Sequence, residues 1–247
     1  MILALLCGAF IGAVLGFVGA GGAMLSVPIL LYIFDFTPTQ ATTAALAVVF
    51  LAALAGVIPK LKSGDVLFRE ALSVWGIGFI SNVGGASLAK HLSDVAILSG
   101  FAGVMIVAGL SMLRGPVKDH PEKRMKPIAL ISTSLIIGAM TGIFGIGGGF
   151  LAIPILVLFY HTPQMKAAGT SLLIITLNCL TSFIAHHSVW SQVKWHTPIL
   201  MGGMAIIVSA ISSHYASRAN ARILRITFAY LLFTIAAFTL IRTWFFA

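Results

Sequence analysis

Two stretches of the sequence decide the fold: GFVGAGGAMLSVP at residues 16–28 and GIFGIGGGFLAIP at residues 142–154. Each belongs to an apolar segment of about 34 residues, 1–34 and 127–160, whereas a membrane-spanning helix needs about 20. Relative to alanine, glycine weakens a helix by about 1 kcal/mol and proline by about 3. We therefore predict that each long segment forms two half-helices that meet at an unwound glycine stretch. At membrane depth, such backbone has to be buried in protein or line a water-filled cavity.

The two stretches are copies of one another, which predicts an internal repeat. Residues 41–43 (Ala-Thr-Thr) also correspond to residues 168–170 (Ala-Gly-Thr). Two homologous repeats, residues 1–113 and 127–247, would then be joined by a polar linker of residues 114–126. Nine positions of the first long segment recur 126 residues later: Gly12, Gly16, Gly19, Gly21, Gly22, Leu25, Pro28, Ile29 and Leu30 as Gly138, Gly142, Gly145, Gly147, Gly148, Leu151, Pro154, Ile155 and Leu156.

The composition predicts a membrane protein. Of the 247 residues, 59% are hydrophobic and 9% are charged, whereas an ordinary soluble domain carries about 25% charged residues. The predicted fold class is therefore an all-α polytopic membrane protein of the cell (inner or plasma) membrane, multi-pass. Each repeat would hold one glycine-broken segment and three further helices. The six further apolar segments are 41–58, 70–89, 95–113, 167–186, 196–216 and 223–245.

The remaining composition excludes several classes. A net charge of +9 indicates basic loops facing the cytoplasm and anionic lipid rather than nucleic-acid binding. Cys7 and Cys179 form no CxxC motif, so we predict packing roles and neither a redox nor a metal site. The histidines near segment ends are expected to be interfacial, with no metal and no cofactor; they are His161, His186, His187 and His214.

The topology depends on whether the long segments cross the membrane or return to the side from which they entered. With the linker in the cytoplasm, hairpins place twelve Lys and Arg inside and three outside, whereas crossing segments place ten inside and five outside. Basic residues concentrate in cytoplasmic loops. The count therefore favours hairpins, three crossings per repeat and inverted repeats.

The glycine clusters are candidate anion sites. A broken helix exposes amide groups and the positive end of the next half-helix, and paired breaks in two repeats mark a transporter's central site. Consecutive glycines also let backbone approach a ligand. The alternative is close helix packing, which suits Gly8, Gly12 and Gly16. The candidate binding glycines are Gly21, Gly22, Gly147, Gly148 and Gly149.

Polar side chains inside the apolar segments supply further candidates. Thr43 follows the first glycine stretch, and Thr170, Ser171 and Asn178 follow the second. Hydroxyl and amide groups donate neutral hydrogen bonds that suit the oxygens of a small oxyanion. The alternative is interhelical bonding worth about 0.6 kcal/mol per group.

Residues 142–154, together with Ala168-Gly169-Thr170-Ser171-Leu172, resemble the sulfite exporter TauE/SafE family, also called the TSUP permeases. The resemblance covers essentially the whole chain. It implies transport of sulfite, thiosulfate, sulfoacetate, taurine-related sulfonates or another small organic anion. The first copy departs from the motif, because Ala23 replaces the third glycine, so the two halves of a site would be chemically unequal.

Three functions remain in view: an anion carrier with alternating access, an anion channel whose filter is built from the same breaks, and a membrane-embedded enzyme. No G-x-S-x-G, HExxH or P-loop motif is present, which argues against the enzyme. No Asp or Glu lies inside an apolar segment, which argues against a carboxylate proton relay. The carrier is favoured, and the sequence leaves open whether it acts as a homodimer.

Overall fold

The protein is helical in the computed structural model, which describes residues 1–19, 21–113, 127–145, 147–148, 152–153, 156, 164–216 and 221–245. Seven of its helices are long and apolar enough to cross a membrane, and no strand occurs within these ranges. The prediction of an all-α polytopic membrane protein is confirmed. The elements are α1 (Ile2–Val18), α2 (Gly21–Tyr32), α3 (Pro38–Lys62), α4 (Phe68–Ala89), α5 (Asp94–Leu113), α6 (Pro127–Phe144), α8 (Gln164–Ala185), η1 (His187–Gln192), α9 (His196–Tyr215) and α10 (Ala221–Phe245).

The first long segment contains two helices. Helix α1 ends at Gly19, whose φ of 83° is left-handed, and α2 begins at Gly21. A Cβ added to Gly22 would collide with the Ile11 carbonyl on α1, so the chain folds back along the helix it has just left. Pro28 lies within α2 without ending it.

Local sequence sets the start of the next helix. Pro38 occupies the first turn of α3, where its missing N–H removes no helical hydrogen bond. The Thr37 hydroxyl accepts from the Gln40 amide at 3.4 Å, and the Gln40 side chain accepts from the Thr37 amide at 3.3 Å. This capping box supplies acceptors for two amides that would otherwise lack partners.

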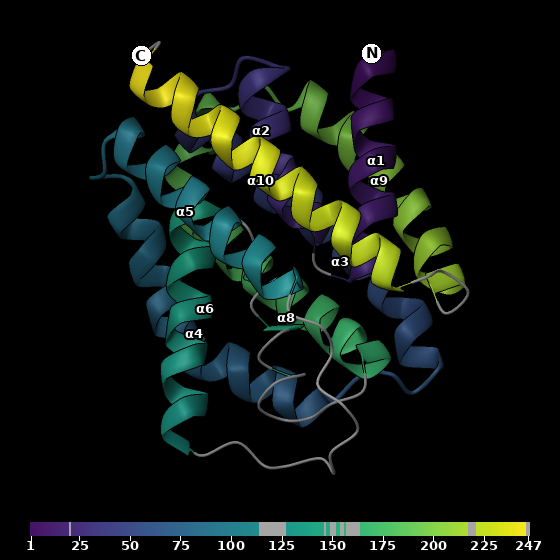
Figure 1. The fold of residues 1–247 in the computed structure, drawn as a ribbon. Helices are drawn as coiled ribbons and strands as arrows, with labels where there is room; N and C mark the ends of the chain where they lie inside the picture. Colours follow the sequence, from purple (N-terminus) through teal and green to yellow (C-terminus); the bar gives the residue numbers. More distant parts are fainter. Residues whose placement is uncertain are drawn as a thin grey trace.

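Helices α3 and α8 form the centre of the bundle. Of the residues in their most apolar windows, 67% and 61% are buried, against 28% for α6. The two helices pack against each other, while α5 and α10 pack together as a separate pair (Figure 1). Polar groups on α3 and α8 are therefore the ones shielded from lipid.

The other close pairs join the two halves of the sequence, because α1 packs on α9 and α6 packs on α4. Glycines allow backbone-to-backbone approach in both pairs, as expected for Gly8, Gly12 and Gly16. The main approaches are Gly12 to Ala205, Gly16 to Ser209, Gly138 to Gly78 and Gly142 to Asn82.

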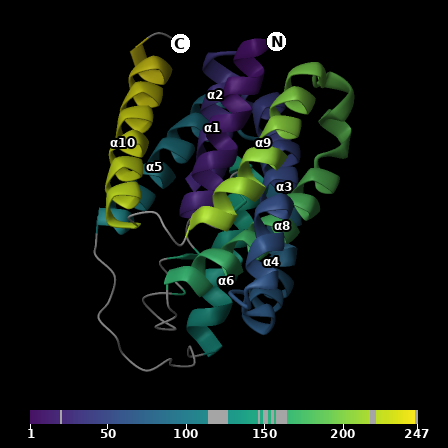
Figure 2. The same ribbon diagram turned by 90° about the vertical axis from the view of Figure 1, so that its right-hand side faces the viewer.

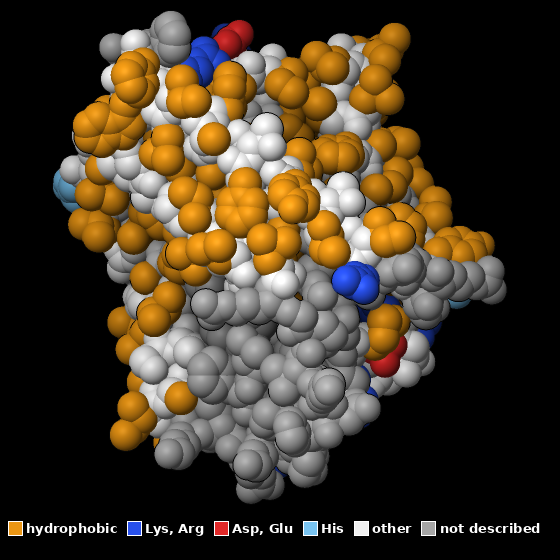
Figure 3. All heavy atoms as spheres, viewed as in Figure 1, with side chains coloured by type: hydrophobic (Ala, Val, Ile, Leu, Met, Phe, Trp, Pro, Cys, Tyr) orange, Lys and Arg blue, Asp and Glu red, His pale blue; other side chains and the backbone are white. Residues whose placement is uncertain are grey.

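The outer surface is apolar, as lipid contact requires. Figure 3 shows hydrophobic side chains over most of the described part of one face, with few charged ones. Ile2, Ile80 and Ile128 are each more than 70% exposed, which water would disfavour over so wide an area. The N- and C-terminal ends lie at the same end of the bundle in Figures 1 and 2. The chain is a multi-pass membrane protein.

Candidate anion site

Glycine turns bring each long segment to the opposite half of the sequence. Gly19, at the first turn, lies against Ala168 near the start of α8. Gly145, with φ of 68°, lies against Thr42 near the start of α3. Each turn therefore approaches the start of the helix in the other half that carries the candidate hydroxyl groups. Sequence order alone did not indicate these contacts between the two halves.

The predicted binding glycines lie at these turns. Gly21 begins α2, and Gly147 and Gly148 have φ of 70° and 66°, a conformation that favours glycine. A Cβ on Gly147 would lie 2.9 Å from the Cys179 sulfur, and one on Gly148 would lie 2.7 Å from the Thr141 hydroxyl. The space beside these α-carbons is thus filled by protein, so the glycines serve packing here. Gly149 lies outside the described residues.

Thr43 belongs to a hydrogen-bonded group with a histidine. The His186 Nε2 lies 3.1 Å from the Gly142 carbonyl, and its Nδ1 lies 3.1 Å from the Thr43 hydroxyl. A carbonyl only accepts, so Nε2 carries the proton. The single Thr43 hydroxyl proton then has two acceptors within reach, the Thr39 carbonyl at 2.8 Å and His186 Nδ1 at 3.1 Å. His186 directly follows the end of α8 and is fully buried within the protein, whereas His187 is exposed.

Asn178 belongs to a second group, which we call the amide cluster (Asn82, Asn178 and Ser182). The Asn82 Nδ2 donates to the Asn178 backbone carbonyl at 3.1 Å and to its Oδ1 at 3.3 Å. The Ser182 hydroxyl donates to the Asn82 Oδ1. The Asn178 Nδ2 is buried and has no hydrogen-bond partner among the described residues, so the cluster holds a donor that an added acceptor would satisfy.

Thr170 lies at the opposite end of α8. Its hydroxyl donates to the Lys166 carbonyl at 2.7 Å and accepts from the Leu67 amide at 3.0 Å, which ties the α3–α4 connection to α8. Ser171 beside it is buried. Asn178 is eight residues from Thr170, or about 12 Å of helix. The predicted residues therefore do not form one contact group but lie at successive levels along α8.

Lys60 is a buried residue that sequence reasoning missed. Its exposed fraction is 4%, whereas the sequence predicted basic residues in loops that face the cytoplasm. Gly169 permits this burial, because a Cβ there would lie 3.2 Å from the Lys60 Cβ and would collide with the Asp65 carbonyl. The feature of the sequence that could have indicated this burial is Gly169, because a glycine in a helix often allows another segment to approach closely.

Among the described residues, the interior holds neutral hydrogen-bond donors and one buried lysine, Lys60. None of the four acidic side chains that the structure describes is buried. Among the described residues, no three His, Cys, Asp or Glu side chains converge to hold a metal ion. Hydroxyls and amides can hold an oxyanion by hydrogen bonds without the strong attraction of several fixed charges.

A multi-pass helical bundle with polar side chains shielded in its interior is typical of membrane transporters. The chain belongs to the sulfite exporter TauE/SafE family, whose family model matches residues 4–239. A probable membrane transporter protein of Xylella fastidiosa (strain Temecula1) is 29% identical, covering 96% of this chain and 94% of that protein. The probable membrane transporter protein YunE of Bacillus subtilis is 25% identical, covering 76% and 78%.

Proposed function

We propose that the protein is a secondary transporter of a small anion of the sulfur oxyanion or organosulfonate class, such as sulfite, thiosulfate or sulfoacetate. Transport would proceed by alternating access around two broken-helix sites. The name of the family supports the sulfite class, whereas the names of the two relatives specify only membrane transport.

The observation that carries this proposal is the unpartnered donor of the amide cluster. Asn178 Nδ2 is buried between α4 and α8, and no described residue offers it an acceptor. A sulfur oxyanion presents only acceptors unless it is protonated, so it complements this donor. No described carboxylate is buried nearby to repel it.

The two glycine turns would form the remaining contacts. One site would combine Gly21 and Gly22 with Thr170 and Ser171, because Gly19 lies against Ala168. The other would combine Gly147, Gly148 and Gly149 with Thr43, because Gly145 lies against Thr42. Asn178 would lie between them. The backbone amides of the turns, rather than the filled space at their α-carbons, would face the anion.

Inverted repeats, residues 1–113 and 127–247, would provide the two states. Their support is the matching of contacts: α1 meets α9 as α6 meets α4, through equivalent glycines. With three crossings per repeat, both termini would be extracellular, in keeping with their common end of the bundle (Figure 2). Rocking of one repeat against the other would then expose the buried donors to each side in turn.

A ligand screen of the purified protein tests the substrate class. Sulfite, thiosulfate and sulfoacetate should raise the melting temperature in a concentration-dependent manner, because ligands that bind only the folded state stabilise it. Acetate and phosphate serve as comparison anions. A larger stabilisation by a comparison anion than by all three sulfur compounds would contradict the proposed class.

A further inference from the structure

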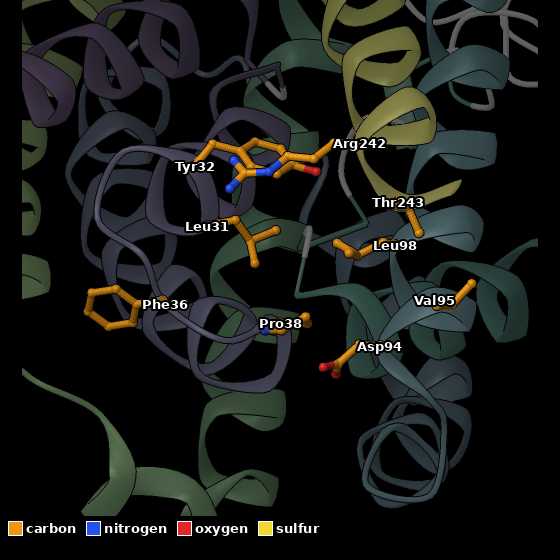
Figure 4. Close-up of a pocket in the computed structure, with 9 residues that line it drawn as sticks. All are labelled: Leu31, Tyr32, Phe36, Pro38, Asp94, Val95, Leu98, Arg242 and Thr243. Carbon is orange, nitrogen blue, oxygen red and sulfur yellow. The ribbon is translucent and has the colours of Figure 1, made fainter. Parts of the chain in front are cut away.

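A cavity of about 260 Å³ lies away from the amide cluster, where the ends of α2 and α10 meet the starts of α3 and α5. Figure 4 shows Tyr32, Asp94 and Arg242 around it, with Arg242 above the Tyr32 ring. Asp94 starts α5 and Arg242 belongs to the last turn of α10. The cavity is therefore at the boundary between membrane and water rather than at membrane depth.

The cavity contains polar groups without protein partners. The Tyr32 and Thr243 hydroxyls are buried and make no hydrogen bond within the described part of the chain. The Arg242 guanidinium carbon lies 5.0 Å from the centre of the Tyr32 ring. For the residues that the structure describes, this is the one interaction recorded for Arg242. A buried hydroxyl without a partner costs folding free energy, so two of them beside an arginine indicate a ligand.

We propose that this cavity is an outer binding site for a small monoanion. The Arg242 guanidinium would pair with the anion's oxygens, and the Tyr32 and Thr243 hydroxyls would donate to them. The site is separate from the amide cluster. Its role as the first contact of the transported anion rests on the proposed function and applies to a monoanionic substrate such as hydrogen sulfite.

Asp94 gives this site a charge preference. Its side chain projects into the same cavity from α5, on the far side from Arg242 in Figure 4. One carboxylate and one guanidinium together leave little net positive charge. A monoanion can therefore contact Arg242, whereas a dianion also meets repulsion from Asp94.

Thiol labelling inside the cavity tests the site without a transport assay. Val95 lines the cavity and is 39% exposed, and the native Cys7 and Cys179 are buried. We would use Val95→Cys in the full-length protein in proteoliposomes, with a sulfonate-bearing methanethiosulfonate as reagent and methanesulfonate as protecting anion. At ten times the Kd, protection should slow labelling about tenfold.

Substitutions define the expected pattern. Arg242→Gln should abolish the protection while leaving the rate with an uncharged methanethiosulfonate unchanged, which checks the fold around the cavity. Tyr32→Phe should weaken the protection without lowering the melting temperature, because the removed hydroxyl has no protein partner. Asp94→Asn should allow sulfate, a weak protector of the unmodified site, to protect as well as methanesulfonate.

Two results would overturn the proposal: no protection by methanesulfonate at any concentration, or equal protection with Arg242 and with Gln at that position. Protection without any transport of sulfur anions would instead refute the proposed function and leave the outer site standing. Transport of sulfur anions without protection at Val95→Cys would refute the outer site and leave the proposed function standing.

Discussion

Asn178 is buried, and its side-chain Nδ2 group lacks an acceptor in the part of the chain that the structure describes. Its Oδ1 and backbone carbonyl accept from Asn82, while its Nδ2 has no acceptor. Leaving a buried donor unpaired costs about 1–3 kcal/mol. Binding an acceptor at this Nδ2 would recover that cost, which partly offsets the stability that the Asn178 Oδ1 gains from its bond with Asn82.

Asn178→Leu should weaken anion binding about 10- to 100-fold, the value of one hydrogen bond to a charged group, with little loss of stability. Binding is measured by the ligand-dependent melting temperature. Ser132→Val is the matched control, because Ser132 is exposed on α6 and donates only to its own helix. Equal affinity in both variants would remove Asn178 from the site.

The bond between Thr43 and His186 predicts an energetic coupling between α3 and the end of α8. Thr43→Val and His186→Phe should each destabilise the protein, and the double variant should lose about 1 kcal/mol less than the sum. Denaturation of the detergent-solubilised protein gives the four values. Strict additivity would mean that the two side chains do not share a hydrogen bond.

At the residue scale, the sequence predicted the kinds of group but not their partners. Thr43, Thr170 and Asn178 stood out as polar side chains in apolar segments, and all three are buried. His186 and Lys60 looked like residues of helix ends. His186 bonds to the Gly142 carbonyl on α6, 44 residues earlier in the same half, and Lys60 packs against Gly169 in the other half. Neither neighbour is local in sequence, so local pattern could not reveal the burial.

At the scale of elements, glycines on α1 and α6 decide how the two halves fit. Gly142 has the Asn82 carbonyl where its Cβ would be, and Gly16 has the backbone of Ser209. A methyl group at either position would push two helices apart. Both helices are apolar, so dispersion and close approach supply the attraction between them and their partners in lipid.

Gly142→Ala and Gly16→Ala should each destabilise the protein by about 1–3 kcal/mol, the usual cost of overpacking. Gly84→Ala on α4 is the matched control, because no described atom outside the neighbouring backbone of α4 lies within 4 Å of its added Cβ, and it should be neutral or stabilising. The yield of monodisperse protein and its melting temperature report the effect. Tolerance of alanine at Gly142 would contradict the packing of α6 on α4.

Sequence patterns predicted the helices well, because length and hydropathy are local properties. The expected segment 41–58 is α3 (Pro38–Lys62), and 95–113 is α5 (Asp94–Leu113). The pairing of α1 with α9 and of α6 with α4 was beyond the sequence, since every helix is apolar and lipid imposes no preferred partner.

At the scale of the whole molecule, the topology follows from the direction of the two long segments. With hairpins, Trp244 near the C-terminus is extracellular and Lys62 is cytoplasmic, whereas crossing segments put both inside. Both side chains are exposed, and the native cysteines are buried.

An impermeant thiol reagent added to intact cells should therefore label Trp244→Cys, and Lys62→Cys only after permeabilisation. Ile2→Cys, near the other terminus and exposed, should behave like Trp244→Cys. Labelling of Trp244→Cys and Lys62→Cys from the same side would contradict the inverted arrangement.

The central claim is that the buried donors serve a carrier of sulfur oxyanions, and counterflow of radiolabelled sulfite in proteoliposomes tests it most directly. Unlabelled sulfite loaded inside should drive transient, saturable accumulation of labelled sulfite, because a carrier exchanges its substrate through one alternating site. Flux that rises linearly with concentration and gains nothing from internal sulfite, or that appears as single-channel current, would contradict the account.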